Sequence, residues 1–277
     1  MSENPYQAPE AALEAEPGAF AGDVQEPQRV RARRGAAWLG RSVTLFRSSW
    51  GTWVAMLLVT GLLMFALALI PLLNLAASVA MPIFFGGFML AAHRIATTGS
   101  SPVGTLIDGF RYHFGGLAGV GVVALLGVVV YVAVVFGTLY AMGIGPGMEA
   151  GEMDPQQAER IFQVMPLATL GGMALNLPFV MATLFAPALV AIHGVDLLAA
   201  LRMSFTACLR NVLPFLVLGL VLIGIGIGVA VVVGLLSVLH PVVGLLAYLL
   251  ALLVLAPLIT LTIYTAHADI FLGPEPA

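Results

Sequence analysis

Positions 211–268 read NVLPFLVLGLVLIGIGIGVAVVVGLLSVLHPVVGLLAYLLALLVLAPLITLTIYTAHA and contain no Asp, Glu, Lys or Arg. A helix needs about 20 apolar residues to cross the hydrocarbon core of a bilayer, so this stretch is long enough for two spans. His240-Pro241 lies near its middle and predicts a tight turn, because proline starts a helix readily but does not continue one. The stretch therefore predicts a transmembrane hairpin with helices at about 213–238 and 243–267.

The rest of the chain repeats this pattern. Of its 277 residues, 60% are hydrophobic and 9% are charged, and the mean hydropathy is +1.04, whereas soluble domains carry about 25% charged residues. Three further uncharged runs cover 48–93, 112–148 and 161–195. They predict spans at about 52–70, 73–92, 117–141 and 168–192. The fold class is therefore an all-α polytopic membrane bundle with six transmembrane helices.

The two ends of the chain differ from this central part. Residues 1–28 are rich in Pro, Glu, Ala and Gln, and such a segment buries too little apolar surface to offset the entropy of ordering it. We expect residues 1–28 to form a disordered, acidic and proline-rich cytoplasmic tail. Residues 29–271 form the six-span domain, and residues 272–277 form a short C-terminal tail.

The arginines predict the orientation. All 11 basic residues are Arg, a usage typical of a GC-rich bacterial genome. With a cytoplasmic N-terminus, every arginine except Arg160 lies on the cytoplasmic side, which satisfies the positive-inside rule. We therefore expect a multi-pass protein of the bacterial cytoplasmic (inner) membrane with both termini in the cytoplasm.

Three amphipathic segments, 33–50, 102–114 and 196–210, each precede a predicted hairpin. In the first, Leu39, Val43 and Phe46 recur at helical spacing. We expect these segments to be helices on the cytoplasmic surface of the membrane. Their recurrence raises the possibility of a triplicated two-span repeat, although any six-span protein with short outer turns looks periodic. Each inward span carries a proline and then a histidine: Pro82 and His93, Pro187 and His193, Pro257 and His267.

A resemblance rests on three groups of residues. Leu184–Val190, then Ser204, Cys208, Asn211 and Pro214-Phe215, and finally Tyr264 with Ala268–Phe271 resemble a family of uncharacterised bacterial inner-membrane proteins, a domain of unknown function. Arg41, Phe46, Trp50, Pro71, Pro82 and Gly86-Gly87 fit the first half of the same family. The architecture is also similar to the membrane domain fused to some glycerophosphodiester phosphodiesterases. The resemblance implies a fold and a membrane location but no established activity.

Polar chemistry is sparse in the predicted spans, which contain no Asp, Glu, Lys or Arg. Such residues, where a span keeps them, usually mark ion paths or proton relays, so we expect neither ion-coupled transport nor an enzyme, and we predict no catalytic residue, cofactor or metal ligand. Asn74 and Asn176 are the candidate intramembrane polar contacts. They bond neighbouring helices or, alternatively, line a solute path. A less favoured hypothesis brings His93, His193 and His267 together as a zinc site.

Function is therefore expected to depend on helices and lipid. The candidate contacts to the anionic inner leaflet are Arg33, Arg34, Arg41 and Arg47. The leading hypothesis is a non-enzymatic scaffold, assembly or lipid-organising protein that binds membrane lipids and pairs with a membrane protein or a second copy, and not with nucleic acid. The alternative is an uncoupled channel or transporter for a small or apolar solute.

Overall fold

A computed structural model describes residues 24–69, 71–144 and 155–273, and within these ranges every regular element is a helix. The predicted tails therefore lie mostly outside the described residues. The elements in chain order are α1 (Arg34–Ser48), α2 (Trp50–Ala68), α3 (Pro71–Thr98), the 3-10 helix η1 (Val103–Ile107), α4 (Asp108–Tyr112), α5 (Phe114–Ala141), α6 (Pro155–Thr183), α7 (Ala186–His193), α8 (Leu197–Arg210), α9 (Val212–Leu239) and α10 (Pro241–Phe271).

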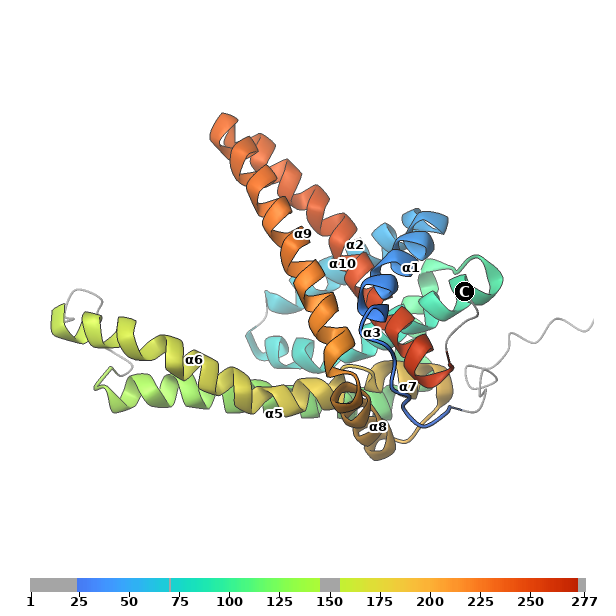
Figure 1. Ribbon diagram of the computed structural model, residues 1–277, viewed down its shortest axis with the longest axis horizontal. Coiled ribbons are helices and arrows are strands. Elements are labelled where there is room, and N and C mark those ends of the chain that lie inside the picture. Colours follow the sequence, from blue (N-terminus) through green and yellow to red (C-terminus); the bar gives the residue numbers. More distant parts are fainter. Residues whose placement is uncertain (1–23, 70, 145–154, 274–277) are drawn as a thin grey trace, which may run out of the picture.

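The helices form three long hairpins that meet at one end. The hairpins are α2/α3, α5/α6 and α9/α10. The short helices α1, η1, α4 and α7 pack around the adjoining ends of α3 and α10, and α8 packs on α6 and α7. We call this region the hub. Figure 1 shows the α5/α6 and α9/α10 hairpins leaving the hub in different directions. Large side chains buried in the hub include Trp38, Trp53, Phe185 and Phe271.

The six predicted spans are confirmed as six helical segments long and apolar enough to cross a membrane. Two of them run further than predicted at the hub end, because α3 ends at Thr98 rather than near 92 and α10 ends at Phe271 rather than near 267. The extra turns lie in the hub, where their polar side chains form hydrogen bonds and ion pairs with other helices. Asp269 is therefore helical and buried, although the predicted span stopped before it.

The fourth span is broken where α6 gives way to α7, just before Pro187. In a continuous helix the amide of Phe185 would bond the carbonyl of Met181. Here the Ser204 hydroxyl of α8 stands between them, accepting from Phe185 N (3.0 Å) and donating to Met181 O (2.7 Å). A side chain inserted into the backbone ladder is an established cause of a helix break. Pro82 and Pro257, in contrast, lie inside continuous helices, so the three predicted repeats differ at this point.

The three predicted amphipathic segments are short helical elements of the hub. The face of α1 that is fully buried consists of Gly35, Trp38 and Ser42, whereas Leu39 and Phe46 are half-buried at its flank. A methyl group added to Gly35 would meet the carbonyl oxygen of Pro214 at 2.1 Å, so the backbones of α1 and α9 touch there. The location of these helices at a membrane surface stays a prediction.

Candidate functional site

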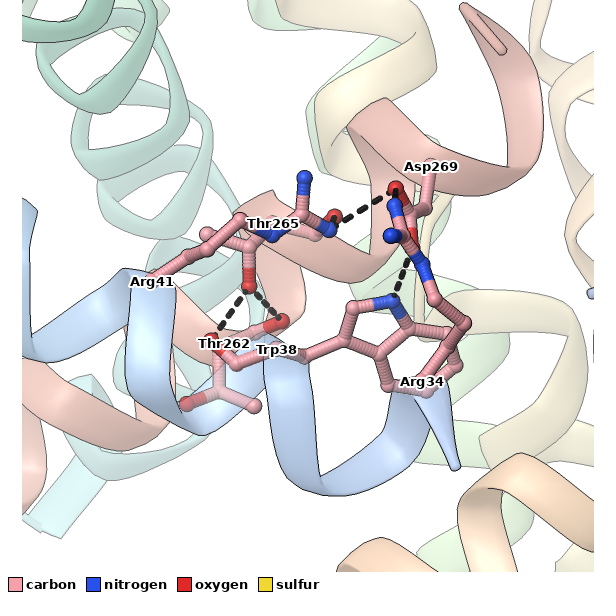
Figure 2. Close-up of polar contacts among 6 residues, drawn as sticks. All are labelled: Arg34, Trp38, Arg41, Thr262, Thr265 and Asp269. Atoms are coloured by element: carbon pink, nitrogen blue, oxygen red, sulfur yellow. Dashed lines mark hydrogen bonds and ion pairs between the residues drawn. The ribbon is translucent and has the colours of Figure 1, made fainter. Parts of the chain in front are cut away.

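A cluster of ionic and polar side chains joins α1 to the last two turns of α10 (Figure 2). The Asp269 carboxylate accepts from Arg34 Nε at 2.6 Å and from Trp38 Nε1 at 2.7 Å. Its other oxygen contacts the terminal nitrogens of Arg34 and, at 2.8 Å, of Arg41. Arg41 also donates to the carbonyl of Thr265 at 3.2 Å. Both carboxylate oxygens are therefore engaged, and the side chain of Asp269 is fully buried.

Helical spacing assembles this cluster from both sides. Arg34, Trp38 and Arg41 follow each other at steps of four and three, which places them on one face of α1. Thr265 and Asp269 are four apart on α10, and the Thr265 hydroxyl donates to the Trp38 carbonyl at 3.0 Å. A buried carboxylate needs such partners, because removing a charge from water without them costs several kcal/mol.

A segment without regular secondary structure, residues 24–33, crosses the hub beside this cluster and ends in a turn at Ala32-Arg33, and we call it the strap. The amides of Gln25 and Gln28 donate to the carbonyls of Phe271 (3.1 Å) and Ile270 (2.9 Å). These carbonyls belong to the last turn of α10, which has no partners within its own helix. The final five residues of the predicted disordered tail, 24–28, are thus hydrogen-bonded to the protein, whereas residues 1–23 lie outside the described part.

Asn211, between α8 and α9, fixes the strap in the hub. Its side-chain oxygen accepts from the Val30 amide at 2.8 Å, and its amide group donates to the carbonyls of Gln28 and Ala207, both at 2.9 Å. The neighbouring Arg210 donates to the Pro27 carbonyl at 2.8 Å. Asn211 is fully buried, and its three hydrogen bonds connect the strap to the elbow between α8 and α9.

The three histidines of the inward spans do converge in the hub. The His193 and His267 rings have centroids 5.2 Å apart and planes inclined by 34°. Tyr264 bridges to the third histidine, since its hydroxyl lies 3.3 Å from His93 Nδ1. Within the ranges that the structure describes, no group of three ligands is placed to hold a metal ion. The arrangement is a packed aromatic cluster in which α3, α7 and α10 meet.

The chain is similar to a probable inner membrane protein of Burkholderia thailandensis. The two are 33% identical over 202 residues, which cover 69% of this chain and 73% of the relative. This chain belongs to the same inner-membrane protein family. No protein-family model matches it, and no solved structure matches it significantly. With six apolar helices, this membership makes it a multi-pass inner membrane protein. The predicted likeness to the phosphodiesterase-fused domain is not shown.

The predicted lipid contacts of this inner-membrane protein divide into two groups. Arg34 and Arg41 are about a quarter exposed and pair with Asp269, because they flank the buried face of α1. Arg33 and Arg47 are exposed on the surface of the hub. Contact with lipid stays a prediction for all four.

The predicted intramembrane asparagines also differ. The side chain of Asn74 lies outside the described part of the chain. Asn176 of α6 is half-buried, and its side-chain oxygen lies against Gly127 of α5. That position is at a close helix–helix contact within one hairpin, and hydrogen bonding between the helices stays a prediction.

Two features of the hub were not predicted from the sequence, the buried Asp269 and the face of α1 that binds it. Asp269 was not predicted because the last span was expected to end at 267. An acid only two residues beyond a span could have indicated a buried ion pair. The face Arg34-Trp38-Arg41 was missed because Leu39, Val43 and Phe46 form a more obvious apolar stripe. Cys208 is buried, and burial raises the pKa of its thiol to about 12.

Proposed function

We propose that this inner membrane protein is a non-enzymatic scaffold, in which the hub holds three hairpins apart so that their outer faces bind lipid and the helices of a partner. The α9/α10 hairpin is the observation that supports this most directly. The buried residues of α9 are Pro214 and Leu218, both in its first two turns. Beyond them α9 exposes large side chains such as Ile223, Ile227 and Val231.

The placement of polar groups also favours a scaffold over an enzyme. Asp269 has a fully buried carboxylate, and two guanidinium groups and an indole N–H hold it. A general acid must be able to donate a proton to a bound substrate, and a general base must be able to accept one from it. Asp269 is committed to joining α1 and α10, which is the role expected of a structural support.

An apolar crevice favours the alternative, a channel or transporter for a small or apolar solute. It encloses about 270 Å³ where α3, α5, α6, α7 and α10 approach each other. Its walls include Pro82, Ala124, Pro187 and Ile263. A solute of matching polarity would pass between the hairpins at this level.

Photo-crosslinking tests the scaffold in living cells. A photoreactive amino acid at Ile227 or Val231, both more than half exposed, should capture one protein of fixed mass, either a partner or a second copy. The matched control is Leu218, buried on the same helix, which should give no intermolecular adduct. Lipid adducts alone from all three positions would argue against a protein-binding scaffold.

A flux assay tests the alternative. Full-length protein in liposomes should pass no small neutral solute if it is a scaffold. A flux that is abolished by Ala124→Phe, which narrows the crevice, and is retained in Gly40→Ala, an open position on α1, would overturn the scaffold in favour of a channel.

A further inference from the structure

The strap presents a row of arginines. Arg29, Arg31 and Arg33 are exposed, whereas Val30 and Ala32 between them are half-buried. Exposure alternates along residues 29–33, so Val30 and Ala32 face the hub and the three arginines face outward. The hydrogen bond from the Val30 amide to Asn211 holds this register.

A cavity of about 560 Å³ lies between the strap and the elbow that joins α8 to α9. Arg29 and Arg31 line it from the strap, and Arg210 lines it from the end of α8. The remaining wall is apolar and includes Leu209, Val212 and Leu213, each more than half exposed. The cavity thus has a cationic side and a hydrocarbon side.

The cationic side carries more positive than negative charge. Among the residues that the structure describes, Arg29 and Arg31 make no ion pair, and Arg210 donates to a neutral carbonyl, that of Pro27. The acid nearest in sequence is Glu26, which lines an adjoining cavity with Arg29 and Arg210. In the described part of the chain, three guanidinium groups against one carboxylate favour an anion, and guanidinium groups match phosphate oxygens in charge and geometry.

The cavity also adjoins the start of a helix long and apolar enough to cross a membrane. Val212 is the first residue of the span formed by α9, so the apolar wall continues into the hydrocarbon-crossing part of the helix. A ligand with an anionic head and an apolar tail fits both walls at once.

We propose that this cavity binds an anionic phospholipid. The phosphate accepts hydrogen bonds from Arg29, Arg31 and Arg210, and the acyl chains lie along Leu209, Val212 and Leu213. This proposal specifies which class of lipid the scaffold of the proposed function binds. It rests on the proposed function only in assuming that the hub lies at the membrane. The same phosphate chemistry would attract a soluble phosphate compound, so the experiment includes both.

The test measures lipid binding to delipidated full-length protein in detergent by native mass spectrometry. Phosphatidylglycerol should bind more tightly than phosphatidylcholine of the same acyl chains. The variant Arg29→Gln with Arg31→Gln should weaken phosphatidylglycerol binding by roughly thirtyfold, with phosphatidylcholine unchanged. Arg29→Lys with Arg31→Lys keeps the charges, should keep most of the preference, and shows that the strap tolerates substitution.

The matched control is Arg111→Gln with Arg202→Gln, which removes the same charge from exposed positions outside the cavity. It should leave phosphatidylglycerol binding unchanged. An equal loss of binding in both double variants would show that the lipid is attracted by the overall positive charge and not by this cavity. Displacement of the lipid by equimolar inorganic phosphate would overturn the lipid assignment, as would the absence of any lipid preference. Crosslinking from Ile227 should be the same in all variants, so failure of this proposal is separable from failure of the scaffold.

Discussion

At the scale of single residues, Asp269 has an unusual position for an acid in a chain this apolar. It is fully buried, and its partners Arg34 and Arg41 are about a quarter exposed. A buried ion pair contributes little compared with a well-packed apolar replacement, but removing one partner leaves the other charges without compensation. The cluster therefore specifies how α1 docks on α10 more than it adds stability.

The first prediction follows from that asymmetry. Asp269→Asn should lower the free energy of unfolding by about 2–3 kcal/mol, somewhat below the value for fully buried pairs because water reaches the two guanidinium groups. Thermal unfolding of the purified protein in detergent measures the change. Glu26→Gln, at an exposed position outside the ion pairs of the described residues, is the control and should unfold like the original protein. Equal stability of the Asn variant would show that the carboxylate does not hold α1.

How far the sequence can predict the structure also depends on residue-scale detail. The six spans follow from long apolar runs, because the cost of charge in hydrocarbon dominates every other term there. The hub follows less well, since its short helices are stabilised by contacts between residues far apart, such as Ser204 with Phe185 and Asn211 with Val30. Those partners carry no local periodicity, so only the folded chain reveals them.

At the scale of elements, the crossing of α1 over α9 depends on one glycine. Gly35→Ala would place a methyl group 2.1 Å from the Pro214 carbonyl oxygen, which belongs to a backbone that cannot rotate away. We expect the two helices to be pushed apart at a cost of about 1–3 kcal/mol or more. Gly40→Ala on the same helix, with nothing within 4 Å, should instead stabilise by about 0.5–1 kcal/mol. Thermal unfolding of both variants gives the comparison, and a shift of the same sign in both would contradict the close contact.

The strap supplies the second element-scale prediction. Asn211→Ala removes the two side-chain hydrogen bonds that hold Val30 and Gln28 of the strap. The strap should then open more often, and trypsin should cut after Arg29 and Arg31 roughly tenfold faster. Cleavage followed by mass spectrometry gives the rate. Asn176→Ala removes the same amide group from the α5/α6 hairpin, far along the chain from the strap, and should leave the rate unaltered. Unchanged cleavage in the Asn211 variant would mean that the strap is held by other contacts.

At the scale of the whole molecule, the hub concentrates the basic residues at one end of all three hairpins. Arg160, near the start of α6, is the exception. The positive-inside rule then predicts that the hub lies in the cytoplasm. The single cysteine makes this orientation simple to test, because Cys208 is buried and its thiol pKa is raised to about 12, which leaves almost no reactive thiolate near neutral pH.

The corresponding prediction uses two exposed positions at opposite ends of the hairpins. In whole cells, a membrane-impermeant maleimide that reaches the periplasm should label Ala141→Cys. It should label Ser100→Cys only after the inner membrane is permeabilised. The protein without added cysteine should stay unlabelled in both conditions. Labelling of both variants from the same side would rule out the six-span topology with a cytoplasmic hub.

The ion pair between Arg34 and Asp269 joins residues 235 positions apart, and this separation sets an order of events during biosynthesis. A ribosome that adds about 5–20 residues per second needs on the order of 10–50 seconds to make the intervening chain. Throughout that interval Arg34 and Arg41 have been synthesised and Asp269 has not, so their charges are not yet paired with that carboxylate and can act under the positive-inside rule. The carboxylate of Asp269 is synthesised with the final helix, after the earlier spans. It then pairs with the two arginines. One pair of arginines can thus serve insertion early and assembly late.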